Sequence, residues 1–151
     1  MSVGIISDTH GVLLPTVADA FAGVERIIHA GDVGASWIID HLEEIAPVVA
    51  VVGNMDTGDL GWRLQERAYV QLGMHRVLVV HQGANVPGDV LGQGVSVVVS
   101  GHTHRASIET VDGILYINPG SAGGRSRDGR GPTVALLDCA VDPPTARIVE
   151  L

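Results

Sequence analysis

The sequence is poor in the features that mark secreted, membrane-spanning or disulfide-stabilised proteins. It has a single cysteine, Cys139, so an internal disulfide is excluded and a reducing compartment is expected. No apolar stretch approaches the ~20 residues of a membrane span, and the start, MSVGIISD, has no basic segment typical of a signal peptide. We therefore expect a cytoplasmic protein without a membrane partner.

Positive charge is also scarce. Nine basic residues stand against 17 acidic ones, which gives a net charge of −8. A general nucleic-acid binder needs a basic face, so that class of function is not expected. A small substrate that contains phosphate remains compatible with this charge if metal ions supply the positive charge locally.

Aromatic residues make up 3% of the chain, whereas hydrophobic residues make up 46%. A packed core of Val, Ile, Leu and Ala is therefore expected, in one domain over residues 1–151. In the first half, β-branched runs at 3–6, 26–29 and 47–52 alternate with helical spacing at 13–21 and 35–45. This βαβαβ order predicts a parallel sheet.

The second half reads as consecutive strands. Two hairpins are expected, at Gly73-Met74 and at Asp112-Gly113. The strands are expected at 68–72, 76–80, 95–99, 107–111, 114–117, 133–138 and 146–149, with loops or short helices at 56–66, 83–94 and 120–131. This number of strands is too large for one covered sheet, so the sequence predicts an α/β fold of two sheets packed face to face with helices outside.

Polar residues follow five of the apolar strands where each ends. They are Asp8, His10, Asp32, Asn54, His81, His102 and His104. Ligand sites of α/β sheets lie beyond the carboxyl ends of the strands. Side chains at i and i+2 of an extended backbone point the same way, so Asp8 and His10 can converge. The same spacing holds for His102 and His104.

These seven residues offer oxygen and nitrogen ligands and no thiolate. They are too many for one tetrahedral zinc. They suit two transition-metal ions that share one carboxylate, and such a pair acts as a clamp for in-line attack on phosphorus. Taken alone, any one of these residues could equally be a solvent-exposed polar residue at a strand end and not a metal ligand.

The motifs D-x-H, GD, GN, H and GHTH occur in this order and resemble the calcineurin-like metallophosphoesterase superfamily. The SDTHG start, GNMD and NPGS are similar to its small bacterial and archaeal phosphodiesterase branch, which is also similar to the retromer scaffold subunit. The resemblance implies a four-layer α/β/β/α sandwich of two mixed β-sheets. It implies one ion on Asp8, His10 and His104, a second on Asn54, His81 and His102, and Asp32 between them.

On this resemblance the cofactor is two divalent ions, with Mn expected and Fe, Ni, Co or Zn left open, and a hydroxide between them as nucleophile. The expected catalytic residues are Asp32, Asn54 and Asp56, and Arg125 and Arg127 are expected to bind the substrate. Asp56 enters as a replacement proton donor. Many relatives have histidine after GN, but this chain has Met55, which cannot act as an acid.

A diester carries one negative charge and does not require that histidine, so a small phosphodiester is the expected substrate. Three alternatives stay open: a retromer-like scaffold without catalysis, a phosphomonoesterase, and a nucleotide pyrophosphohydrolase. A homo-oligomer also stays open. Of the other notable residues, His29 is expected to be a partly buried structural residue, Trp62 to pack its loop onto the body, and Cys139 to lie in the core.

Overall fold

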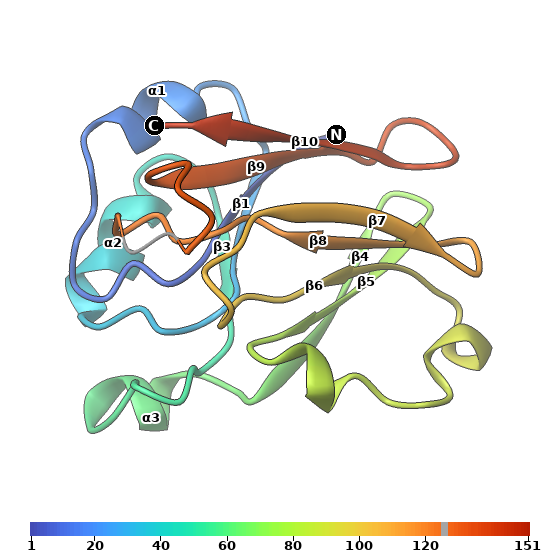
Figure 1. Cartoon of the computed structure of the whole chain (residues 1–151), viewed down its shortest axis with the longest axis horizontal. Coiled ribbons are helices and arrows are strands. Elements are labelled where there is room, and N and C mark those ends of the chain that lie inside the picture. Colours follow the sequence, from blue (N-terminus) through green and yellow to red (C-terminus); the bar gives the residue numbers. More distant parts are fainter. Residues whose placement is uncertain (125–126) are drawn as a thin grey trace.

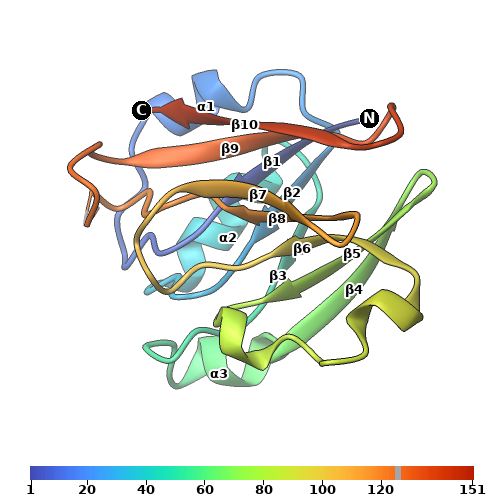
Figure 2. The same ribbon diagram turned by 45° about the vertical axis from the view of Figure 1, so that its right-hand side comes forward.

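The computed structural model describes residues 1–124 and 127–151. Two five-stranded mixed sheets lie face to face (Figures 1 and 2). The first sheet has the order β10-β9-β1-β2-β3. Its strands β1 (Ser2–Ile6), β2 (Arg26–His29) and β3 (Val48–Ala50) are parallel, and β9 (Thr133–Asp138) and β10 (Thr145–Glu150) continue the sheet antiparallel. The predicted parallel opening is therefore confirmed.

The second sheet has the order β4-β5-β6-β8-β7. Its parallel centre consists of β5 (His75–Val80), β6 (Val95–Val99) and β8 (Ile114–Asn118). The hairpin partners β4 (Arg67–Leu72) and β7 (Ser107–Val111) form the two edges. Both predicted hairpins are present, and the positive φ angles of Asp112 (53°) and Gly113 (78°) show why this pair forms a two-residue turn.

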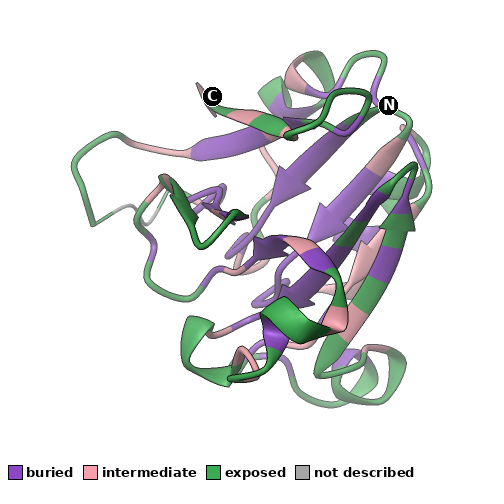
Figure 3. Cartoon of the chain, turned by 90° about the vertical axis from the view of Figure 1, so that its right-hand side faces the viewer, coloured by how far each residue is buried: buried purple, intermediate pink, exposed green. Residues whose placement is uncertain are grey.

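Alternation along the strands divides the apolar side chains between an inner and an outer layer. Between the sheets lies a cluster that includes Val3, Ile5, Ile28, Val77, Val79, Val97, Val99 and Ile117. Cys139 belongs to the same cluster, as predicted, and burial raises the pKa of its thiol to about 11. In Figure 3 the facing strands are largely buried.

Helical segments cover both outer faces. On the first sheet, α1 (Thr16–Ala20) and α2 (Ser36–Glu43) pack Val17, Ile38 and Leu42 against Ile6 and Ile27. On the second sheet, a short 3₁₀ turn at Val90–Gln93 packs Val90 against Leu78 and Val98. The order of layers is therefore α/β/β/α, as expected. Two further short segments, α3 (Asp59–Arg63) and a 3₁₀ turn at Gly83–Asn85, lie in the loops.

The helix expected over 13–21 is wrong in length, because α1 begins only at Thr16. Pro15 occupies its N-cap position, and the proline ring disfavours helical backbone at the preceding residue, Leu14. Trp62 was also wrongly expected to pack, since it is 92% exposed. No helix in the described ranges is long and apolar enough to cross a membrane.

Candidate metal centre

The polar residues at the strand ends come together where the two sheets meet. They stand in the loops after β1, β2, β3, β5 and β6, all of which are parallel strands within their own sheets. Six of the predicted ligands form two compact groups, Asp8–His10–His104 and Asp32–His81–His102. Within each group the ligand atoms lie within 4.8 Å of one another.

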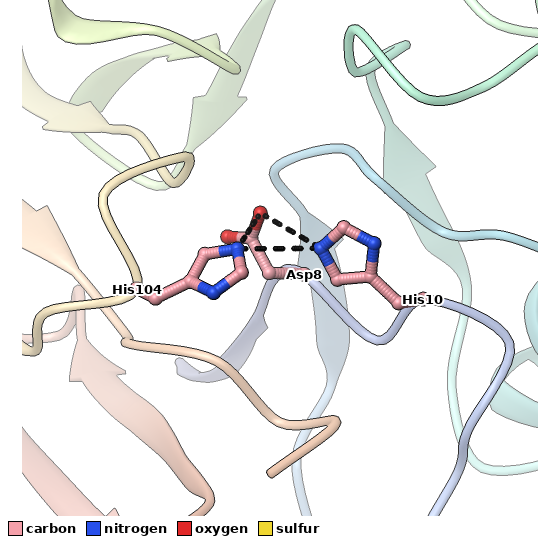
Figure 4. A group of neighbouring side chains, drawn as sticks. All are labelled: Asp8, His10 and His104. Carbon is pink, nitrogen blue, oxygen red and sulfur yellow. Dashed lines mark hydrogen bonds and ion pairs between the residues drawn. The ribbon is translucent and has the colours of Figure 1, made fainter. Parts of the chain in front are cut away.

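The first group joins the loop after β1 to the loop after β6 (Figure 4). The Nε2 atoms of His10 and His104 are 3.3 Å apart. Oδ1 of Asp8 lies 3.3 Å from Nε2 of His104 and 3.8 Å from Nε2 of His10. The three side chains therefore point toward a common centre.

The second group is built on His81. Its Nε2 atom lies 3.2 Å from Oδ2 of Asp32 and 2.9 Å from Oδ1 of Asn54. The rings of His81 and His102 meet edge to face, with centroids 5.2 Å apart. Asn54 is thus adjacent to the group through its amide oxygen, where the sequence placed it.

Asp32 reaches both groups. Its Oδ2 atom is 3.7 Å from Nε2 of His10 in the first group and 3.2 Å from Nε2 of His81 in the second. Oδ1 of Asp32 instead accepts the backbone N–H of Met55 at 2.8 Å, so the carboxylate is held in orientation. The two groups are consequently halves of one site with Asp32 between them.

The backbone carries an independent signal of function. Six non-glycine residues in the described part of the chain have positive φ, and five of them belong to the two groups: Asp8, His10, Asp32, His102 and His104. Such conformations are costly for L-residues and concentrate at functional sites. The pairs Asp8/His10 and His102/His104 therefore converge through left-handed backbone, and the extended geometry expected from their spacing is wrong.

Close approach of the loops depends on glycine at two places. A Cβ on Gly53 would overlap the backbone nitrogen and Oδ1 of Asp32. A Cβ on Gly101 would overlap Oγ of Ser7 and lie 2.7 Å from Oδ2 of Asp8. A larger residue at position 53 would push apart two loops of the first sheet, and one at position 101 would separate the loops of the two sheets.

Asp8 is fully buried, and only one of its two carboxylate oxygens accepts hydrogen bonds. Its Oδ2 atom accepts from Oγ of Ser7 (2.7 Å) and from the backbone N–H of His102 (3.0 Å). Among the described residues, its Oδ1 atom is the one buried side-chain oxygen or nitrogen that lacks a hydrogen bond. Burial raises the pKa of Asp8 above its ordinary value, although these bonds and the nearby His81 and His104 oppose the shift.

The other carboxylate and its histidine have opposite pKa shifts. Burial raises the pKa of Asp32, but the bond from His81 and the backbone N–H of Met55 together bring it below its ordinary value. Burial lowers the pKa of His81, but Asp32 and the carbonyl of Ala30 raise it overall. The 2.7 Å contact from Nδ1 of His81 to that carbonyl places a proton on Nδ1 and directs Nε2 to the site.

The donor set fits divalent metal ions. Ligand atoms at about 2.1 Å from one ion, at angles of about 90–110°, lie about 3.0–3.4 Å apart. Three of the measured spacings, at 3.2 and 3.3 Å, match that range, and the spacing of 3.8 Å between Asp8 and His10 is slightly longer. The orphan Oδ1 of Asp8 points to the same conclusion, because a buried charged oxygen requires a cation or a donor.

Asp56 does not have the environment of the proton donor that the sequence suggested. It is buried, and its carboxylate accepts three backbone N–H groups, from Val33 (3.2 Å), Gly34 (3.0 Å) and Gly53 (2.9 Å). These three hydrogen bonds engage both oxygens of the carboxylate. Asp56 therefore ties the Asp32 loop to the Asn54 loop, and we assign it a positioning role.

Three further residues singled out from the sequence are Arg125, Arg127 and Met55. Arg127 is exposed, and its backbone N–H donates to the carbonyl of His104 at 3.0 Å, which places its loop beside the first group. Arg125 lies outside the described residues. Met55 is 63% exposed, and its backbone N–H alone contacts the site.

Sequence reasoning missed two supporting residues. Ser7 orients Asp8, as described above. Nδ2 of Asn118 donates to the carbonyl of Gly101 (3.0 Å) and to Oγ1 of Thr103 (3.1 Å), which fixes the loop between His102 and His104. Asn118 ends β8, another parallel strand, so the rule applied to the other strand ends would have found it. His29 is fully buried, more than expected, and contacts Oγ1 of Thr9 at 3.1 Å.

Known proteins resemble this chain in sequence and in fold. A probable metallophosphoesterase of Methanocaldococcus jannaschii is 42% identical over 130 residues, which cover 80% of this chain and 68% of that one. A phosphodiesterase of the same organism is 30% identical, with 91% and 93% covered. A solved archaeal phosphodiesterase superposes with a TM-score of 0.84 at 27% identity, covering all of both chains.

Vps29 from Entamoeba histolytica, solved with Zn²⁺, shares the fold, with a TM-score of 0.76 and 24% identity over 99% of both chains. The model of the calcineurin-like phosphoesterase superfamily domain matches residues 1–142. Because this match covers most of the chain, the protein belongs to the calcineurin-like phosphoesterase superfamily.

Proposed function

We propose that the protein is a phosphodiesterase that works with two divalent metal ions, of which Mn is the first to test. The observation that carries this proposal is the position of Asp32, whose Oδ2 atom lies within 3.7 Å of a histidine nitrogen in each ligand group. The 30% identity to a named phosphodiesterase supports the same reaction class. When bound, two such ions supply an activated water and neutralise charge that develops on phosphorus.

The chain's own residues prepare the site for this chemistry. Asp8, His10 and His104 would hold one ion, and Asn54, His81 and His102 the other, with Asp32 shared. The bonds of Asp56 and Asn118 to the loop backbones fix these ligands before a substrate arrives, so little reorganisation is needed. Arg127, in the loop beside the first group, is available to bind a phosphate oxygen.

The preference for a diester rests on Met55. At this position a histidine could protonate a poor leaving group, but a thioether cannot. Asp56, the replacement that the sequence suggested, is engaged with three backbone N–H groups. We therefore expect diesters with good leaving groups to react faster than monoesters.

The test compares bis(p-nitrophenyl) phosphate with p-nitrophenyl phosphate in the presence of Mn²⁺. Diester hydrolysis is expected to be faster, and Asp32→Asn is expected to reduce it by more than about 100-fold, since even residues behind a metal ligand cost 10–100-fold when replaced. Asp19→Asn, an exposed aspartate on α1, is the matched control. Faster monoester hydrolysis would favour the phosphomonoesterase alternative, and hydrolysis of neither would favour a scaffold.

A further inference from the structure

A pocket lined largely by polar residues adjoins the second ligand group. It has a volume of about 220 Å³. It is lined by Val52, Gly53, Asn54, Glu66, His81, Gln82 and Asn85. His81 belongs to both the pocket and the ligand group, and Asn54 lines the pocket while its Oδ1 contacts His81, so a phosphate at the metal centre would place one of its ester groups in this pocket.

Backbone contacts fix the walls of the pocket. The segment that carries Glu66 is held beside the end of β3, since the backbone N–H of Val52 donates to the carbonyl of Gln65 at 2.8 Å. On the other side, the 3₁₀ turn after β5 is closed by the N–H of Asn85 and the carbonyl of Gln82 at 2.9 Å. The pocket is therefore part of the fold.

Three polar side chains of the lining are free to contact a ligand. Throughout residues 1–124 and 127–151, the side chains of Glu66, Gln82 and Asn85 form no hydrogen bond or ion pair with another residue. Each offers an oxygen that accepts hydrogen bonds, and Glu66 adds a negative charge. The lining contains neither lysine nor arginine, so a second phosphate would meet repulsion without a compensating cation.

The lining residues indicate which kind of ester group the pocket can bind. A carboxylate and two carboxamide oxygens suit a primary ammonium, which has three N–H donors. A quaternary ammonium is bound by an aromatic cage, and no Phe, Tyr or Trp is among the lining residues. The volume corresponds to about seven waters at ~30 Å³ each, which leaves space for a short alkyl chain and its hydration.

We infer that this pocket binds the alcohol group of a phosphodiester when that alcohol carries a primary ammonium, with Glu66 as its counter-charge. The inference rests on the proposed phosphodiesterase function and names the substrate class for the same site. It makes Glu66 a specificity residue that contacts the substrate away from the reacting phosphorus.

The experiment measures kcat/KM for p-nitrophenyl phosphoethanolamine, p-nitrophenyl phosphocholine and bis(p-nitrophenyl) phosphate with Mn²⁺. The wild type is expected to prefer the ethanolamine ester over the choline ester. Glu66→Gln is expected to lower kcat/KM for the ethanolamine ester about tenfold, the size of one partly screened charge contact. It should lower kcat/KM for the choline ester less, because that ammonium has no N–H to donate, and change the bis ester, which carries no cation, less than twofold. Glu109→Gln, on the edge strand β7 away from the pocket, should change none of them.

Equal effects of Glu66→Gln on all three esters, or no effect, would overturn the subsite while the proposed function stands. A wild type that favours the choline ester would overturn it as well. If the wild type hydrolyses none of the three esters, the proposed phosphodiesterase function fails, and the subsite fails with it.

Discussion

Replacing Asp8 by asparagine separates the stability of the metal-free protein from metal binding. Oδ1 of Asp8 is buried without a hydrogen bond, and such a group costs about 1–3 kcal/mol, or more when charged. In Asp8→Asn the amide oxygen can keep the bonds from Ser7 and His102. The amide NH₂ can then stand where Oδ1 lies 3.3 Å from Nε2 of His104.

We therefore expect metal-free Asp8→Asn to be more stable than the metal-free wild type by about 1–3 kcal/mol. At about 2–4 °C per kcal/mol for a chain of this length, Tm should rise by roughly 2–12 °C. Mn²⁺ at 100 times its Kd should stabilise the wild type by about 2.7 kcal/mol. The variant should gain less, because it has lost a ligand of the first group.

The assay is calorimetric unfolding of both proteins, depleted of metal and then titrated with Mn²⁺, with Asp19→Asn as the control. The pKa of Asp8 is raised, so the proton it holds in the folded state stabilises the metal-free wild type at low pH, and that stability is lost as pH rises through the raised pKa. The advantage of the variant should accordingly shrink in acid. A metal-free variant less stable than the wild type at pH 7 would refute the reasoning.

Three further predictions concern neighbouring residues. Asp56→Ala leaves three N–H donors without their acceptor and should destabilise the protein by about 2–4 kcal/mol in urea unfolding, whereas unchanged stability would contradict the positioning role. Met55→His should raise hydrolysis of phenyl phosphate, a monoester with a poorer leaving group than p-nitrophenol, by up to about 100-fold, and the equally exposed Met74→His should not; equal rates in both would contradict the reason given for diester preference. Burial lowers the pKa of His29 to about 3 from 6.5, so its stabilising effect holds above pH 6.5 and is lost as pH falls toward 3, about 2 kcal/mol of it by pH 5. His29→Gln should therefore flatten the loss of stability between pH 7 and 5, and a slope equal to that of the wild type would contradict the shift.

The sequence predicted the layers and the strand ends because both follow from local patterns. Val95–Val99 is apolar and β-branched, and the polar GHTH after it marks the end of the strand. A residue that follows a parallel strand lies at the ligand edge whatever its neighbours are. This reasoning placed six residues that the structure brings into two groups.

Other features depended on contacts that a single sequence does not contain. Asp56 had the chemistry of an acid, and only the folded loops show that N–H groups of Val33, Gly34 and Gly53 converge on it. Trp62 is hydrophobic enough to be expected in a packed position, yet its side chain is 92% exposed. The left-handed backbone at His102 and His104 is likewise not specified by the two residues alone, because histidine adopts positive φ only in a minority of cases.

The central claim is that Asp32 joins two metal ions, and anomalous diffraction from crystals soaked in Mn²⁺ tests it most directly. The account predicts two anomalous peaks about 3.5–4 Å apart, one beside His10 and His104 and one beside His81 and His102, with the Asp32 carboxylate between them. A single peak, or peaks that do not contact Asp32, would contradict it.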